Sequence, residues 1–138
     1  MFPSLRKALS TLRSIRSVQF PDHLVVEKVE GSVDEWMMLE PMTFHVRFTN
    51  GNIIILTVPT GFTHDLSSVP GWLQSVFSKV GRYDKASVAH DYLYDRHINK
   101  FFADAVFFHG MRHLGTKPWK AWAMYLAVWA FGQKEWAD

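Results

Sequence analysis

The residues of this chain best suited to chemistry are a histidine and two aspartates in its C-terminal half. His90 and Asp91 are consecutive, and Asp104 follows on what should be the next helix. A carboxylate that accepts a hydrogen bond from one imidazole nitrogen leaves the other nitrogen available as a base. A second carboxylate beside that base could hold a hard cation next to a polarised carbonyl or phosphoryl oxygen. The three side chains together predict a hydrolytic site.

The expected helices bring two of these side chains to the same level. The sequence predicts one helix from Asp84, which suits the N-cap, to about Arg96, and another over about residues 101–114. If the turn between them centres near residues 98 and 99, His90 and Asp104 both lie about 10 Å from it, at about 1.5 Å per residue. Two antiparallel helices would therefore present His90 to Asp104.

The motifs around these residues resemble a known catalytic helix pair. His-Asp-x-x-Tyr-Asp, which begins at His90, and the later Ala-Asp-x-x-Phe around Asp104 resemble phospholipase A2 enzymes, most closely the compact form in parvovirus capsid proteins. The resemblance implies that His90 is the general base and that Asp104 orients it. It also implies that Tyr94 is a supporting phenol and Asp91 a calcium ligand. It covers about a quarter of the chain, and that family's glycine-rich calcium loop and disulfides are not recognisable here.

A longer stretch, roughly residues 46–131, is similar to a domain of unknown function that is common in tailed phages and prophages. Residues 61–70, Gly-Phe-Thr-His-Asp-Leu-Ser-Ser-Val-Pro, are similar to that family's Thr-Asp-x-Ala-Ser-Val-Pro signature, although His64 separates the threonine from the aspartate. Gly71 stands where a basic residue often follows the proline. The motifs Gly-Arg-Tyr, His-Asp-Tyr-Leu-Tyr and Ala-Asp then follow in the expected order. The resemblance implies a phage or prophage origin and a fold, but no established reaction.

Asp65 joins the candidate site on chemical grounds. It lies in a turn-rich connector that could fold back over the helices, beside Asp91, Asp104 and His90. An oxygen-rich set with one imidazole suits calcium, magnesium or manganese better than zinc. Two alternatives stay open. Asp65 can instead cap a helix that starts near Pro70, and the His90–Asp104 pair can instead be a buried structural hydrogen bond.

Two further histidine patterns are weaker. His64 with the His90-Asp91 pair resembles the His…His-Asp…Asp phosphohydrolases, but that fold is wholly helical and its last aspartate comes much later. His109 and His113 stand one helical turn apart, a spacing that zinc can use. No glutamate lies between them and no third ligand is indicated, so we interpret them as a solvated helix end.

The rest of the chain predicts an α+β fold, in which a small antiparallel β-sheet precedes an antiparallel helical hairpin and an aromatic C-terminal helix. Apolar residues at helical spacing predict an amphipathic N-terminal helix over residues 4–17. Patterns of period two predict strands over residues 24–27, 36–39, 44–48 and 52–58. Asn50-Gly51 suits a two-residue type I′ turn between the last two strands.

Two more helices are expected in the C-terminal half. A short one should start at Ser68 or Pro70 and run to Phe77. The last should run from Trp119 to about Lys134 with its aromatic residues packed against the hairpin. We treat the 138 residues as one domain, composed of a basic helix (1–18), a β-sheet (20–60) and a helical module (61–138).

Composition limits the classes of function. There is no cysteine, which excludes disulfides and thiolate sites. The net charge of +2 argues against an obligate nucleic-acid binder, although four basic residues precede the first acid, Asp22. No signal peptide or transmembrane segment is expected, because the longest apolar run, residues 121–131, is too short to span a bilayer. We expect the protein in the virion or the host cytoplasm.

The sequence leaves open whether the protein is an enzyme. One hypothesis is a phage-associated hydrolase of an ester, lipid or cell-envelope component, with a divalent cation at Asp91 and Asp65. The other is a non-catalytic virion or tail component in which the same residues form a buried polar staple. Its partners would be phage structural proteins, a second copy or a membrane surface, bound through the N-terminal helix and the aromatic C-terminal helix.

Overall fold

The computed structural model describes residues 5–32, 35–64 and 84–131, and it has the α+β fold class expected from the sequence. The first sheet contains β1 (Ile15–Gln19), β4 (Met42–Phe48) and β5 (Ile53–Val58), and the second contains β2 (Val26–Lys28), β3 (Trp36–Met38) and β6 (Thr63–His64). The helices are α1 (Leu5–Ser14), α3 (Asp84–Asp95), α4 (Lys100–His113) and α5 (Pro118–Phe131). The short helix expected over residues 68–77 lies outside the described residues.

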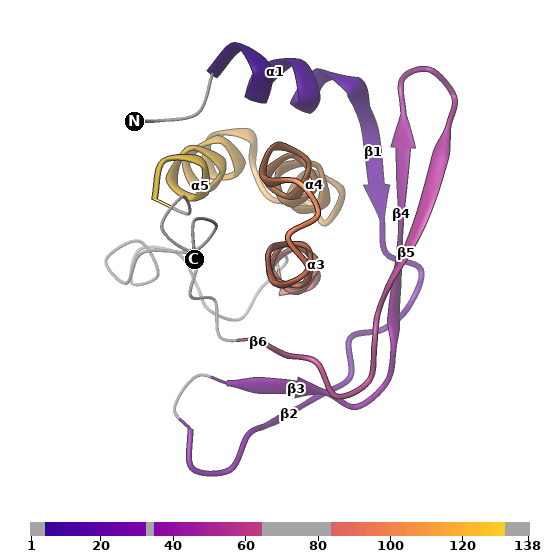
Figure 1. Cartoon of the computed structure of the whole chain (residues 1–138), viewed down its shortest axis with the longest axis vertical. Helices are drawn as coiled ribbons and strands as arrows, with labels where there is room; N and C mark the ends of the chain where they lie inside the picture. Colours follow the sequence, from indigo (N-terminus) through magenta and orange to yellow (C-terminus); the bar gives the residue numbers. More distant parts are fainter. Residues whose placement is uncertain (1–4, 33–34, 65–83, 132–138) are drawn as a thin grey trace.

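The helices lie on one side of the first sheet, and the second sheet lies below α3 in the view of Figure 1. Strand β4 is central, with β1 and β5 antiparallel on either side. Its alternation gives a fully buried inner face with Phe44 and Val46, while Arg47 is exposed on the opposite face. The period-two pattern of this strand is therefore explained by one face packed against helices.

The β4–β5 hairpin forms as predicted, but its turn is of another type. The Gly51 N–H donates to the Phe48 carbonyl (3.0 Å), and the Phe48 N–H donates to the Asn52 carbonyl (2.9 Å). Gly51 has φ 93°, whereas a type I′ turn also needs a positive φ at Asn50, and within the described residues only His97 among non-glycines has one. The bonding is that of a three-residue loop closed by a glycine bulge, so the predicted type I′ turn is wrong.

The N-terminal helix is shorter than predicted. It ends at Ser14 rather than near residue 17, and Ile15 begins strand β1. The buried residues Ile15 and Val18 are three apart, which is a helical spacing, and they share one face of β1 only because the strand has a bulge between Ile15 and Ser17. The Ser14 carbonyl accepts the Thr49 N–H (2.9 Å), which ties the helix end to the hairpin loop. Residues 15–17, which were predicted to belong to the N-terminal helix, thus form part of the first sheet.

Helix α4 is the centre of the helical layer, with α1, α3, α5 and β1 packed around it (Figure 1). Gly110 allows α4 to lie close to Ala86 of α3 and to Phe20. A Cβ atom at this position would lie 3.0 Å from the Cβ of Ala86 and 3.1 Å from Cζ of Phe20. The aromatic helix α5 packs on α4, one of the two helices of the helical hairpin, where the Phe108 and Trp122 ring centroids are 4.6 Å apart.

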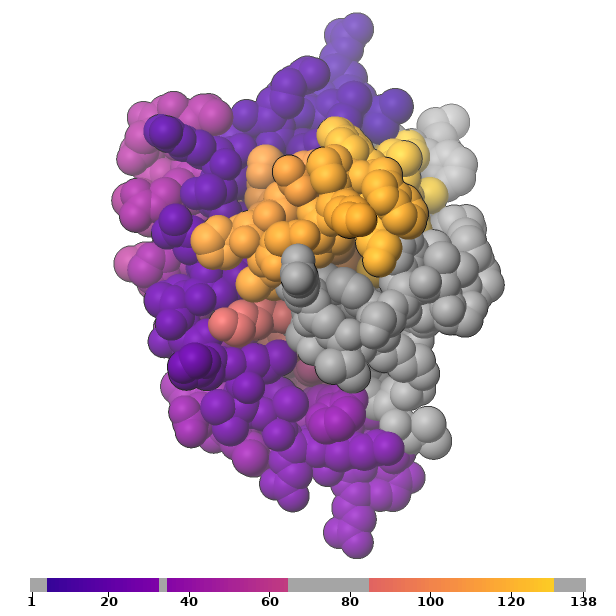
Figure 2. All heavy atoms as spheres, turned by 180° about the vertical axis from the view of Figure 1, so that it is seen from behind, coloured from indigo at the N-terminus to yellow at the C-terminus, as the bar shows by residue number. Residues whose placement is uncertain are grey.

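The outer side of α5 faces away from this core. Trp119 is 61% exposed and Leu126 is 47% exposed, and the helix forms part of the molecular surface in Figure 2. No helix in the described ranges is both long and apolar enough to cross a membrane.

His109 connects α4 to α1. Its Nε2 lies 2.8 Å from the Leu12 carbonyl, so Nε2 must carry the hydrogen and donate it. Burial lowers the pKa of His109, and the bond to Leu12 offsets only part of that effect. The interpretation of both histidines as a solvated helix end is therefore wrong for His109, while His113 is exposed.

We expect the α1–α4 contact to weaken in acid. Because the folded-state pKa of His109 is below 6.5, the unfolded chain binds more protons as the pH falls through 6.5, and stability present above that pH is lost. His109→Gln can still donate to Leu12 but does not titrate. The free energy of unfolding of wild type minus that of the variant, from urea denaturation, should fall between about pH 7.5 and about pH 5. A difference that is constant with pH would refute this.

Candidate functional site

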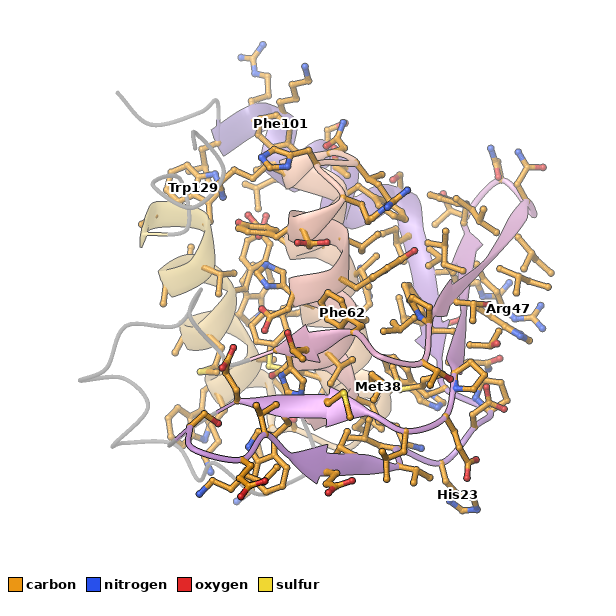
Figure 3. All side chains as sticks on the ribbon, turned by 60° about the horizontal axis from the view of Figure 1, so that its bottom comes forward. His23, Met38, Arg47, Phe62, Phe101 and Trp129 are labelled. Carbon is orange, nitrogen blue, oxygen red and sulfur yellow. The ribbon has the colours of Figure 1, made fainter. Side chains whose placement is uncertain are left out.

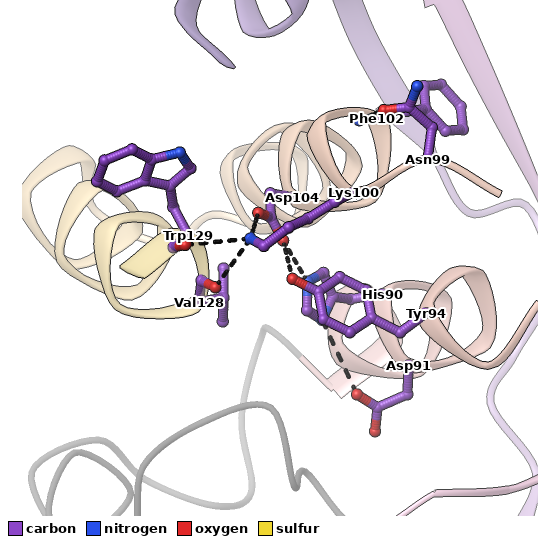
Figure 4. Close-up of polar contacts among 9 residues, drawn as sticks. All are labelled: His90, Asp91, Tyr94, Asn99, Lys100, Phe102, Asp104, Val128 and Trp129. Atoms are coloured by element: carbon purple, nitrogen blue, oxygen red, sulfur yellow. Dashed lines mark hydrogen bonds and ion pairs between the residues drawn. The ribbon is translucent and has the colours of Figure 1, made fainter. Parts of the chain in front are cut away.

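The predicted meeting of His90 and Asp104 is present in the structure. His90 Nε2 lies 2.8 Å from Asp104 Oδ1, between α3 and α4 (Figure 4). Both side chains are buried, His90 with 1% and Asp104 with 0% of its surface exposed. Since a carboxylate can only accept, Nε2 carries the proton and Nδ1 is the other, titrating nitrogen.

The turn between the two helices sets their relative level. His97 has φ 48°, the Ile98 N–H donates to the Leu93 carbonyl (3.2 Å), and the His97 N–H donates to the Tyr94 carbonyl (3.0 Å). This is the Schellman ending of a helix, with a histidine where glycine is usual. Asn99 then caps α4 by accepting the Phe102 N–H on its side chain (3.1 Å). The chain reverses in a few residues, as the geometric argument required.

Asp104 binds two further donors. The Tyr94 hydroxyl donates to Oδ1 (2.8 Å), and Lys100 Nζ donates to Oδ2 (2.6 Å). Lys100 also reaches the carbonyls of Val128 and Trp129 on α5, at 3.3 and 3.1 Å. The carboxylate therefore holds three helices together. Lys100 was missed by sequence reasoning, although its position one turn before Asp104 is the spacing of a helical ion pair.

The buried charge of Asp104 changes the acidity of its neighbours. Burial alone would lower the pKa of His90, but its hydrogen bond to Asp104 and the negative charges of Asp104 and Asp91 raise it above 6.5. Burial, with the negative charge of Asp104, raises the pKa of Tyr125 to about 12. The site thus stabilises an imidazolium and keeps the nearby phenol protonated.

The opposite side of the imidazole faces Asp91. His90 Nδ1 lies 3.9 Å from Asp91 Oδ1, and His64 Nδ1, on strand β6, lies 3.7 Å from Asp91 Oδ2. The Asp91 side chain is 11% exposed, so it is the most accessible member of this group. His64 is therefore a neighbour of the site, and strand β6 of the second sheet positions it. In the sequence it was considered only for a weak resemblance to phosphohydrolases.

The oxygen-rich cation site predicted from the sequence can be compared with the structure only at Asp91, Asp104 and His90. Both oxygens of Asp104 are occupied by protein donors, and Asp104 and Asp91 lie at opposite nitrogens of His90. Asp65 lies outside the described residues. Within the parts of the chain that the structure describes, no group of three or more acidic or histidine side chains is arranged to hold a metal ion. The geometry thus places Asp104 and Asp91 on different sides of His90, and the cation site of Asp91 and Asp65 stays a prediction.

Comparison with known proteins assigns the chain to a protein family. Residues 36–128 match the family model described as "Protein of unknown function (DUF1353)". The chain belongs to this family. The DUF1353 match runs from the first residue of β3 into α5, so it includes the helix pair that carries His90 and Asp104, and it excludes α1 and β1.

The DUF1353 chain also has a curated relative, "Uncharacterized protein y4jT" of Sinorhizobium fredii (strain NBRC 101917 / NGR234). The two are 38% identical over 95 residues, which cover 62% of this chain and 26% of the relative. The chain therefore spans about a quarter of that protein's length. No solved structure matches the DUF1353 chain.

We expect Asp104→Ala to destabilise the DUF1353 protein by about 3–5 kcal/mol, because the Lys100 ammonium loses its carboxylate while remaining buried. The double variant Lys100→Met/Asp104→Asn should lose less than the sum of its two single variants, since it removes both charges together. Urea denaturation gives the free energies of unfolding. The control Asp95→Ala, at the exposed end of α3, should stay within about 0.5 kcal/mol of wild type. A cost for Asp104→Ala no larger than that of Asp95→Ala would contradict the network.

Proposed function

We propose that this DUF1353 protein is a hydrolase in which His90 Nδ1 is the general base. One observation carries the proposal: Asp104 holds His90 through Nε2 at 2.8 Å, which leaves Nδ1 directed to the side of Asp91. An imidazole fixed at one nitrogen and basic at the other is the arrangement that activates water or an alcohol for attack. The resemblance of the helix pair to phospholipase A2 enzymes supports the same assignment.

The reaction we propose is hydrolysis of a carboxylic ester, a class that includes acyl lipids. A water molecule gives one proton to His90 Nδ1 as its oxygen attacks the carbonyl carbon. The imidazolium then returns that proton to the departing alkoxide, so that ester and water become acid and alcohol. Asp104 orients the ring and, with Asp91, stabilises the transient imidazolium. Tyr94 positions Asp104 by donating to the oxygen that also binds His90.

The direction of substrate approach follows from what surrounds the imidazole. The Nε2 side is closed by Asp104, Tyr94 and Lys100, all of them buried. A substrate must therefore reach Nδ1 from the side of Asp91 and His64. This side is also where the predicted cation, bound by Asp91 and Asp65, would lie, and when bound it would polarise the ester carbonyl.

The activity test uses p-nitrophenyl butyrate and fluorogenic phosphatidylglycerol vesicles as probes. We expect His90→Gln to lower kcat by about 10²–10⁴-fold, the usual loss when a general base is removed. His113→Gln, which replaces an exposed histidine on the neighbouring helix, should keep wild-type activity and controls for contaminating esterases. A folded His90→Gln protein with full activity would show that His90 is not the base.

The cation is tested separately, by melting temperature in calcium, magnesium or manganese. A cation that binds the folded protein raises its stability by about 2.7 kcal/mol at about 100 times its Kd. We expect a rise with at least one of the three ions, and we expect Asp91→Asn to abolish it while Asp95→Asn keeps it. The absence of any rise at millimolar metal would remove the cation from the proposal but leave the role of His90 to the activity test.

A second candidate is a non-catalytic phage virion or tail component. The observation that favours it is the near-complete burial of His90 and Asp104, with both carboxylate oxygens satisfied by protein donors, as in a structural staple. Helices α1 and α5 would then be the surfaces that bind phage proteins, a second copy or a membrane. This function predicts a stability loss in Asp104→Ala and no esterase activity in wild type. The hydrolase predicts the same stability loss together with esterase activity in wild type.

A further inference from the structure

Two arginines stand side by side on the outer face of the first sheet. Arg47 on β4 is exposed, and Figure 3 shows its side chain on the side of the sheet away from the helices. Its partner in register on β1 is Ser17, and a bulge between Ile15 and Ser17 inserts Arg16 beside it. A bulge redirects the side chain of its extra residue. Both arginines line the same hollow of the surface.

Nothing within the described parts of the chain neutralises this pair. Neither the Arg16 nor the Arg47 side chain makes an ion pair, hydrogen bond or ring contact with another residue there. Like charges that face each other on neighbouring strands destabilise a sheet. The fold therefore does not explain why the two arginines lie together. Two neighbouring arginines without a carboxylate partner are what we expect of an anion-binding site in the absence of its ligand.

The hollow has the chemistry of such a site. It encloses about 370 Å³, enough for a phosphate group and part of the molecule that carries it. Besides the two arginines it is lined by Ser17 and Gln19, whose side chains can donate hydrogen bonds, and none of the described residues that line it is acidic. Ile53, the register partner of Arg47 on β5, provides an apolar wall beside the donors, whereas the Phe48 ring packs against Phe102 on the helix side of the sheet.

We propose that this hollow binds the phosphate group of a phosphate ester. The planar forks of two arginines match phosphate oxygens in bidentate geometry better than they match a monovalent anion such as chloride. The apolar wall would contact the organic part of the ester. The phosphate can belong to a soluble small molecule or to an anionic lipid headgroup. The hollow lies on the face of the sheet opposite the helices, so this site is independent of His90 and of the proposed hydrolysis.

The first arm of the test titrates the isotope-labelled full chain with inorganic phosphate at constant ionic strength, with chloride as the reference anion. We expect saturable shifts in the amide resonances of Ser17, Gln19 and Gly51, and a loss of affinity of about tenfold or more in Arg47→Gln and in Arg16→Gln. Arg13→Gln, an exposed arginine on α1 outside the hollow, should bind phosphate as wild type does.

The second arm uses sedimentation with vesicles of phosphatidic acid in phosphatidylcholine, against phosphatidylcholine alone. Binding of wild type but not of Arg47→Gln to the acidic vesicles assigns the site to a lipid headgroup. Phosphate binding without vesicle binding assigns it to a soluble phosphate ester. Amide shifts that chloride reproduces, or equal losses in Arg13→Gln and Arg47→Gln, would overturn the proposal, because both indicate unspecific attraction to a basic surface.

Discussion

The buried carboxylate of Asp104 is the constraint on which the helical layer depends. A charge removed from water is costly unless it is paired and hydrogen-bonded, so the surrounding chain must deliver donors to both of its oxygens. α3 supplies His90 and Tyr94, α4 supplies Lys100, and Lys100 in turn binds two carbonyls near the end of α5. The relative level of three helices is thus fixed by one acid, because a slip of a single turn would leave a buried charge without its partners.

The same constraint makes the two nitrogens of His90 different from each other. Nε2 is committed to the interior, while Nδ1 faces Asp91 and, beyond it, His64 from the second sheet. The same hydrogen bonds can therefore serve to join the helices or to orient His90 as a base. The two functions differ only in whether a substrate reaches Nδ1. The pKa of His90 is raised by the two acids in either case, so acidity by itself does not distinguish the two functions, whereas turnover does.

The sequence predicts this arrangement well where local rules decide it and poorly where distant segments decide it. The His90–Asp104 contact follows from counting residues on either side of a short turn, and the β4–β5 hairpin follows from alternation around Asn50-Gly51. The burial of Lys100 does not follow, because a lysine one turn from an aspartate usually belongs to a solvated face. Here its ammonium also binds carbonyls of α5, which are remote in sequence. The end of α1 and the burial of His109 are likewise set by β4 and by Leu12, both remote in sequence.

The N-terminal segment, which precedes the family match, is part of the hydrophobic core. The DUF1353 match begins at residue 36, yet Ile15, Val18 and Phe20 are buried and β1 pairs with the central strand of the first sheet. Without β1, the backbone groups along one edge of β4 would lose their partners, and the aromatic contact of Phe20 with Phe44 would be lost. β1 also carries Arg16 into the hollow that Arg47 lines, so the segment that completes the core supplies half of the basic pair on the other face of the sheet.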